Sequence, residues 1–162
     1  TITINGVSKS YAMTGWRIGY CGGPSDVIGG MKKVQSQSTS NASSISQAAA
    51  IAALNGTKDE IYSMVEQYKL RHDYLCTALN DTDGFKTTPG TGAFYLFPDV
   101  TNVIEKKGFS DDIELSQYLI EKANVAVVPG SAFGSPGYIR LSYATSLELI
   151  KEAVNRISNS LD

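Results

Sequence analysis

Apolar and polar residues change their spacing several times along the chain, and each spacing predicts a type of element. β-Branched residues alternate at 1–4 and lead into Asn5 and Gly6, which predicts a strand that runs into a turn. A second short strand is predicted at 16–23, where glycines end it. Near-helical spacing predicts helices at 25–38, 44–56, 57–80, 110–123 and 146–161. Further strands are predicted within 84–100 and at 125–130 and 138–144.

The predicted helices and strands alternate along the chain, which indicates an α/β or α+β fold. Capping residues support the starts of two helices: Ser110 or Asp111 for one, and Ser146 for the other. The long helix at 57–80 is predicted to connect an N-terminal portion, 1–56, to a complete α+β unit, 81–162. The first residue, Thr1, lies directly inside a predicted strand, so we expect the chain to be part of a longer protein.

Composition narrows the possible functions. The chain has 162 residues, of which 42% are hydrophobic and 19% charged, with a formal net charge of −2. No basic run is longer than two residues, so no electrostatic footprint for nucleic acid is expected. No apolar stretch is long enough to span a membrane. The two cysteines, Cys21 and Cys76, are too few for a disulfide framework or a metal site, which favours a reducing, cytoplasmic setting.

Lys9 stands among small and apolar residues in the stretch NGVSKSYAMTGWRIGY, 5–20, between two serines. A lysine in a sheltered pocket favours the neutral amine, which attacks carbonyl groups. The surroundings therefore suggest a Schiff-base lysine, and the alternative is an ordinary exposed lysine at a turn.

Two arginines lie in otherwise apolar strands, where a guanidinium needs an anionic partner. No acidic residue occurs before Pro24, so a phosphate from a ligand would suit Arg17, and the alternative is a salt bridge to a distant acid. Arg140 lies in the predicted strand YIRLSYA, and its alternative interpretation is a strand-edge residue that reaches solvent.

These residues resemble the lysine signature of class I pyridoxal-phosphate aminotransferases. The match covers Gly6-Val7-Ser8-Lys9, Ala12-Met13 and Gly15-Trp16-Arg17-Ile18-Gly19. Together with 35–56 the signature looks like the bacterial-type aspartate aminotransferases, and the resemblance continues through 92–100, 125–134 and 138–144. It implies the C-terminal part of the aspartate aminotransferase-like fold of pyridoxal-phosphate-dependent transferases. In that fold 1–56 would be part of the large cofactor-binding domain and 81–162 the small C-terminal domain.

The resemblance also implies residue roles. Lys9 would form the Schiff base with pyridoxal 5'-phosphate and act as the base that moves the substrate proton. Arg17, with Ser8 as a second ligand, would bind the cofactor phosphate, and Arg140 would bind the substrate α-carboxylate. The chain departs from many relatives at Gly6, where they carry a hydroxyl, so that contact would come from a backbone amide or be absent. No metal is implied.

The resemblance implies an aminotransferase acting on amino acid and 2-oxo acid substrates, most simply aspartate, in a homodimer that the loop 37–43 helps to complete. Two alternatives remain: an aromatic or other amino acid transaminase or lyase on the same scaffold, and a non-catalytic aminotransferase-like interaction or sensor module. In the family, an acidic partner of the pyridine nitrogen, a tyrosine and an asparagine come from strands before the lysine. We therefore expect this chain to be a C-terminal part that is a poor catalyst alone.

Other single residues have simpler interpretations. His72 lies in the charged helical stretch KLRHDY and is predicted to be a surface residue. Phe94 and Tyr95 are predicted to belong to the core, with the substrate pocket as the lesser alternative. The two cysteines are predicted to be packed thiols.

Overall fold

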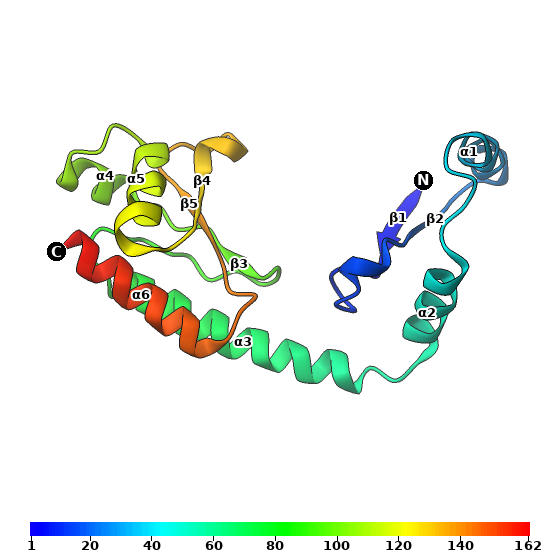
Figure 1. Ribbon diagram of the computed structural model, residues 1–162, viewed down its shortest axis with the longest axis horizontal. Helices are drawn as coiled ribbons and strands as arrows, with labels where there is room; N and C mark the ends of the chain where they lie inside the picture. Colours follow the sequence, from blue (N-terminus) through cyan, green and yellow to red (C-terminus); the bar gives the residue numbers. More distant parts are fainter. The chain divides into compact units, whose positions relative to one another are not determined.

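The computed structural model describes residues 1–162, and these fall into two compact units, Thr1–Ser63 and Met64–Asp162 (Figure 1). The long helix α3, Asp59–Asn80, begins in the first unit and continues into the second. The predicted division at 57–80 remains a prediction, because the compact units do not by themselves define the domains of a longer protein.

The first unit begins with a two-stranded ribbon. Strands β1, Thr3–Gly6, and β2, Gly19–Gly22, pair antiparallel, with Gly6 opposite Gly19 at the end nearest the connecting loop. The second strand starts later than predicted because Thr14–Trp16 form a 3-10 turn. Two helices follow: α1, Ser25–Ser38, and α2, Ser44–Asn55. Both were predicted, and α1 starts directly after Pro24, a residue tolerated at a helix start.

The second unit is an α+β layer built on a small sheet. Strands β3, Tyr95–Leu96, β4, Val128–Pro129, and β5, Ile139–Ser142, are antiparallel in the order β3-β5-β4. The helices are α4, Thr101–Lys107, α5, Asp112–Tyr118, and α6, Leu147–Leu161, and a π-helical turn, Leu119–Ala123, continues α5. Helix α6 lies alongside the C-terminal half of α3 (Figure 1), where Lys151 Nζ lies 5.6 Å from the Tyr74 ring centroid.

The core of the second unit lies between the sheet and these helices. Its most deeply buried side chains come from α3, α5, the π-helical turn, β5 and α6 and are fully excluded from water: Leu79, Leu115, Leu119, Ile139 and Ile157. Each buried leucine or isoleucine stabilises the unit by roughly 1.5–3 kcal/mol relative to exposure. This core fixes the central strand β5, and therefore the backbone of Arg140.

In 84–107 one predicted strand is almost absent and one helix was missed. The first of the two strands expected within 84–100 is reduced to a single bridge between Lys86 and Asp99. Helix α4 was not predicted, although Asp99 Oδ1 accepts a hydrogen bond from the Thr101 amide at 2.9 Å, and Gly108, with φ of 75°, ends the helix.

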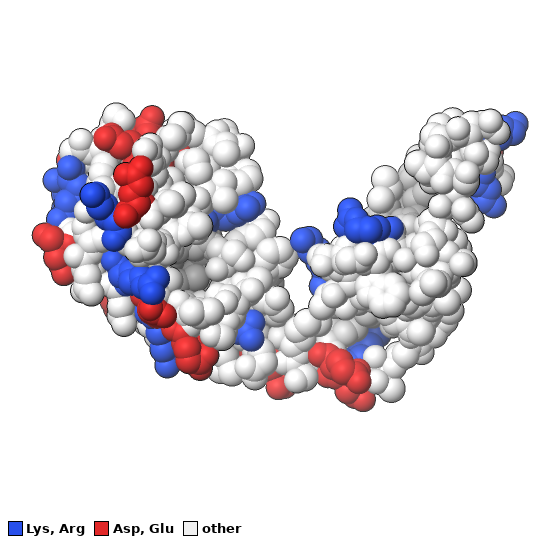
Figure 2. Space-filling model, viewed as in Figure 1, with Lys and Arg blue, Asp and Glu red and all other residues white.

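Charged side chains of both signs alternate over the face of the second unit that Figure 2 shows, without an extended patch of one sign. None of the helices combines the length and apolar character that crossing a membrane requires.

Candidate functional site

The loop 7–18 joins the two strands of the ribbon and carries Ser8 and Lys9 at its start and Arg17 near its end. The buried side chain of Val7 anchors the start of the loop, and the Tyr11 amide donates to Val7 O at 3.3 Å. Ser8 is half-buried, whereas Lys9 is exposed, so the sheltered position expected from its neighbours is not seen in this chain.

Glycines let the two ends of the loop approach closely. A Cβ at Gly19 would lie 3.3 Å from Asn5 O, and one at Gly6 would lie 3.4 Å from Ile18 O. The Gly6 amide donates to Asn5 Oδ1 at 2.8 Å, so this backbone group already has a partner. Because Gly6 pairs with Gly19 at the end of the ribbon, Lys9 and Arg17 lie in one short loop whose two ends are fixed next to each other.

Arg17 has an unusual backbone conformation, with φ of 51° and ψ of 50° in the left-handed region. Ala12 in the same loop has φ of 53°. Such conformations cost a non-glycine residue about 1–2 kcal/mol each, and they concentrate at functional sites. Arg17 Nη1 donates to Thr14 O at 2.9 Å, and the guanidinium forms no ion pair with an acidic side chain. Its other N–H groups can therefore bind an anion.

Arg140 lies on the central strand β5 of the second unit, opposite Val128 of β4. Its guanidinium carbon lies 5.2 Å from the ring centroid of Tyr95 and 4.8 Å from that of Phe133. Tyr95 belongs to β3 on one side of β5, and Phe133 follows β4 on the other. The guanidinium contacts two aromatic rings and has no acidic partner, so its N–H groups can bind a carboxylate.

Sequence reasoning did not place either ring beside Arg140. Tyr95 is 40% exposed, so its assignment to the core was wrong, and its alternative place in the substrate pocket stays a prediction. Phe133 lies within 125–134, a segment that the sequence marked only through the family resemblance. The alternation in β3 could have revealed Tyr95, because its neighbour Leu96 is buried and successive strand residues face opposite sides.

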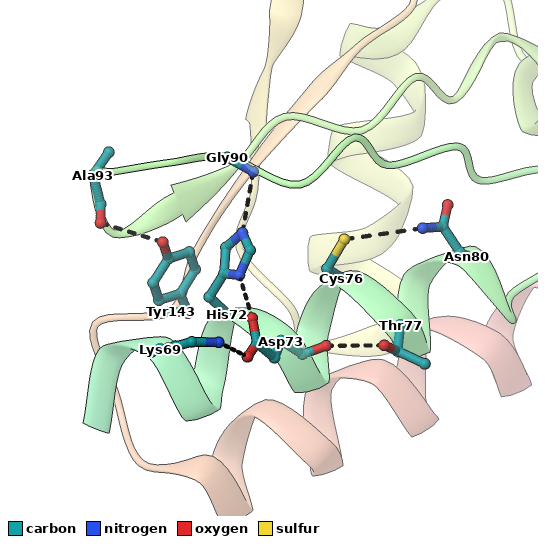
Figure 3. Close-up of polar contacts among 9 residues, drawn as sticks. All are labelled: Lys69, His72, Asp73, Cys76, Thr77, Asn80, Gly90, Ala93 and Tyr143. Atoms are coloured by element: carbon teal, nitrogen blue, oxygen red, sulfur yellow. Dashed lines mark hydrogen bonds and ion pairs between the residues drawn. The ribbon is translucent and has the colours of Figure 1, made fainter. Parts of the chain in front are cut away.

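A polar cluster on α3 holds the segment that leads into β3 (Figure 3). The Gly90 amide donates to His72 Nε2 at 3.1 Å, and His72 Nδ1 lies 2.9 Å from Asp73 Oδ1. The Tyr143 hydroxyl donates to Ala93 O at 3.2 Å. The prediction of His72 as a surface residue was wrong, because only 13% of its side chain is exposed.

A second polar cluster joins α5 to the segment 130–137. The Ser131 amide donates to Asp112 Oδ2 at 2.8 Å, and Asp112 Oδ1 accepts from Ser131 Oγ at 2.8 Å and from the Gly137 amide at 3.1 Å. Complete burial of Asp112 acts to raise its pKa, but these hydrogen bonds outweigh burial and hold the pKa below the ordinary value of 3.8. The carboxylate is therefore ionised and fully engaged.

The structure groups the predicted site residues as follows. Ser8, Lys9 and Arg17 lie together in one loop of the first unit, and Arg140 lies in the sheet of the second. Cys76 is buried, as predicted, and Cys21 is partly exposed. No three His, Cys, Asp or Glu side chains lie together as they would to hold a metal ion.

Comparison with known proteins identifies the family. Residues 1–157 match the family model "Aminotransferase class I and II". The chain belongs to this family. It is 51% identical to the aspartate/prephenate aminotransferase of Nitrosomonas europaea, over 99% of this chain and 42% of that protein. The chain spans about two fifths of the length of the curated relatives it matches.

Two solved structures show the fold. The aspartate aminotransferase of Rhizobium meliloti superposes with a TM-score of 0.92 at 46% identity, covering 100% of this chain and 42% of that one. The aromatic aminotransferase of Pyrococcus horikoshii superposes with a TM-score of 0.89 at 39% identity, covering 98% and 42%. The expected aspartate aminotransferase-like fold is confirmed.

Members of this family use pyridoxal phosphate, and the residues of the loop 7–18 suit that group. The cofactor carries an aldehyde and a phosphate, which require an amine and several hydrogen-bond donors. Lys9 supplies the amine, Ser8 a hydroxyl, and Arg17 a guanidinium with no acidic partner. The donor set therefore fits the cofactor.

Proposed function

We propose that the protein containing this chain is a pyridoxal-phosphate-dependent transaminase that moves an amino group between an L-amino acid, aspartate first, and a 2-oxo acid. One observation carries the proposal. A single loop with closed ends holds a lysine amine together with an arginine that has no acidic partner, at the positions of the aminotransferase lysine signature.

Lys9 has two tasks in this proposal. Its amine would hold the cofactor through the cofactor's aldehyde, and, once released, the same amine would take a proton from the substrate Cα and return it to the reacting molecule. The bound cofactor supplies the electron sink for this proton transfer.

Arg17 and Ser8 are proposed to bind the cofactor phosphate. The left-handed backbone of Arg17 and the hydrogen bond from its Nη1 to Thr14 O restrict the guanidinium, so less freedom is lost when an anion binds. Charge-assisted hydrogen bonds from a guanidinium are about twice as strong as neutral ones.

Arg140 is proposed to bind the substrate α-carboxylate. The rings of Tyr95 and Phe133 both contact the guanidinium and limit its movement. This arrangement suits a planar carboxylate, since two parallel N–H donors can meet two oxygens. Arg140, Tyr95 and Phe133 do not determine selectivity for aspartate. An aromatic amino acid is the second candidate substrate, because a similar solved structure is an aromatic aminotransferase.

We further propose that 1–56 belong to the large cofactor-binding domain of the longer protein, 57–80 to a connecting helix and 81–162 to the small domain. The chain covers about two fifths of its relatives, which supports this assignment. On this view the isolated chain is a poor catalyst and the complete protein works as a homodimer. Sustained turnover by the 162 residues alone would contradict the first expectation.

The test compares Lys9→Ala with Lys33→Ala, an exposed lysine on α1, in the complete protein. Absorbance with pyridoxal phosphate is recorded before and after borohydride, and transamination of aspartate and of an aromatic amino acid is measured with 2-oxoglutarate. Lys9→Ala should lose the borohydride-fixed adduct and about a hundred- to ten-thousandfold in rate, whereas Lys33→Ala should lose neither. An adduct that survives Lys9→Ala would refute the assignment, and the substrate ratio decides between the two candidates.

A further inference from the structure

We propose that Asp112 is a positioning residue for Arg140: it fixes the segment 130–137 so that the Phe133 ring sets the plane of the guanidinium. The proposal rests on the proposed function of Arg140 as the carboxylate ligand. It adds a residue that touches neither substrate nor cofactor.

Asp112 is not needed for the start of its own helix. The N-cap of α5 is Asp111, whose carboxylate accepts from the amides of Ile113 at 2.9 Å and Glu114 at 2.8 Å. Asp112 instead directs both carboxylate oxygens to residues far along the chain, Ser131 and Gly137. A buried carboxylate is costly unless its hydrogen bonds are satisfied, so its presence here indicates a specific task.

The segment that Asp112 holds is tightly folded. Gly130–Phe133 form a 3-10 turn, the Gly130 amide donates to Tyr138 O at 2.7 Å, and the Ser135 amide donates to Gly130 O at 3.0 Å. Asp112 contacts the segment near both ends, at Ser131 and Gly137. The carboxylate therefore determines where the whole segment lies against the sheet.

Phe133 needs such an anchor because burial does not hold it. Phe133 is 49% exposed, and its ring packs edge-on against Phe97, with 6.0 Å between the ring centroids. Yet it lies closer to the Arg140 guanidinium than Tyr95 does, at 4.8 Å against 5.2 Å. A displaced segment 130–137 would remove this ring and free the guanidinium to rotate.

The test uses Asp112→Asn in the complete enzyme. The matched control is Asp111→Asn, which makes the same change of side chain at the neighbouring cap residue but leaves the segment 130–137 anchored. Asp112→Asn should raise KM for the amino acid about tenfold, since small misplacements of binding groups have large effects, while kcat changes less than about twofold. Asp111→Asn should leave KM within about twofold, because it removes no contact to 130–137. The Arg140 Nε–Hε signal in two-dimensional NMR of the 162-residue chain should move away from its ring-shifted position only in Asp112→Asn.

The results distinguish a positioning role of Asp112 from a purely structural one. Equal effects of Asp111→Asn and Asp112→Asn on KM, or an unmoved Arg140 signal, would overturn the proposal and leave Asp112 a merely structural residue. If Asp112→Asn does not fold, Ser131→Ala removes one of the three hydrogen bonds and must shift KM in the same direction. Arg140→Lys separates the two hypotheses: an unchanged KM there refutes the proposed role of Arg140 itself, whatever Asp112→Asn does.

Discussion

Replacing Asp112 by asparagine should destabilise the second unit by about 2 kcal/mol at neutral pH. The Ser131 amide binds Oδ2 and the Gly137 amide binds Oδ1, so the two backbone donors use different oxygens. An asparagine has one oxygen, and at least one of these donors must face its NH₂ group. An unsatisfied buried donor costs about 1–3 kcal/mol, which gives the magnitude.

The difference in the free energy of unfolding between wild type and Asp112→Asn should depend on pH. The pKa of Asp112 is lower in the folded chain than its ordinary value of 3.8, so the unfolded state binds the proton more tightly. The carboxylate therefore contributes its full stabilisation above about pH 5 and loses it as the pH falls through the lowered folded pKa. The variant lacks this contribution. The difference between wild type and Asp112→Asn should stay constant from neutral pH down to about pH 5 and shrink below it.

Other carboxylates with lowered pKa are present in both proteins and cancel in the comparison: Asp73, Asp83, Glu114 and Glu148. Unfolding in urea is followed by far-UV circular dichroism. Fluorescence of Trp16, the single tryptophan, reports the first unit separately. A variant as stable as wild type at pH 7, or a difference that persists unchanged into strong acid, would refute the reasoning.

Two further predictions concern the supports of the Arg140 site. Gly130→Ala should destabilise the chain by about 3 kcal/mol, because its Cβ would lie 2.3 Å from Ser135 O. Gly92→Ala is the control in thermal denaturation, because the space around Gly92 is open. Equal melting temperatures of the two variants would contradict the close approach at Gly130. His72→Leu should leave the Gly90 amide without its acceptor, cost about 1 kcal/mol and speed hydrogen exchange at that amide. His72→Gln retains an acceptor and should show a smaller change, and unchanged exchange in both variants would show that the hydrogen bond does not form in solution.

Local sequence was a good guide wherever contacts were local. The amphipathic helix at 146–161 and its Ser146 cap are confirmed: α6 covers Leu147–Leu161, and Ser146 Oγ accepts from the Leu149 amide at 3.3 Å. The expectation of Asp111 as a cap is confirmed in the same way. Helical spacing could also have predicted the burial of His72, because His72 shares a helix face with the buried Leu75 and Cys76.

The remaining features depend on residues distant in the chain. Nothing around Asp112 indicates that its partners lie at 131 and 137, since no periodicity relates a helix start to a later turn. The rings over Arg140 come from 95 and 133, which only the pairing of β3 and β4 with β5 brings to it. The lysine signature, by contrast, lies within one short segment, so its residues could be identified without knowing the fold.

The pairing of Gly6 with Gly19 has a consequence for the spacing of the cofactor residues. Each strand residue advances about 3.4 Å, so a slip of the ribbon by two residues would move one end of the loop by roughly 7 Å relative to the other. Such a slip keeps every side chain on its original face, but it separates Gly6 from Gly19 and so removes the close approach that joins the two ends of the loop. The register of β1 and β2 therefore determines the distance between the amine of Lys9 and the guanidinium of Arg17. Insertions in 7–18 are tolerable only where they leave this distance unchanged.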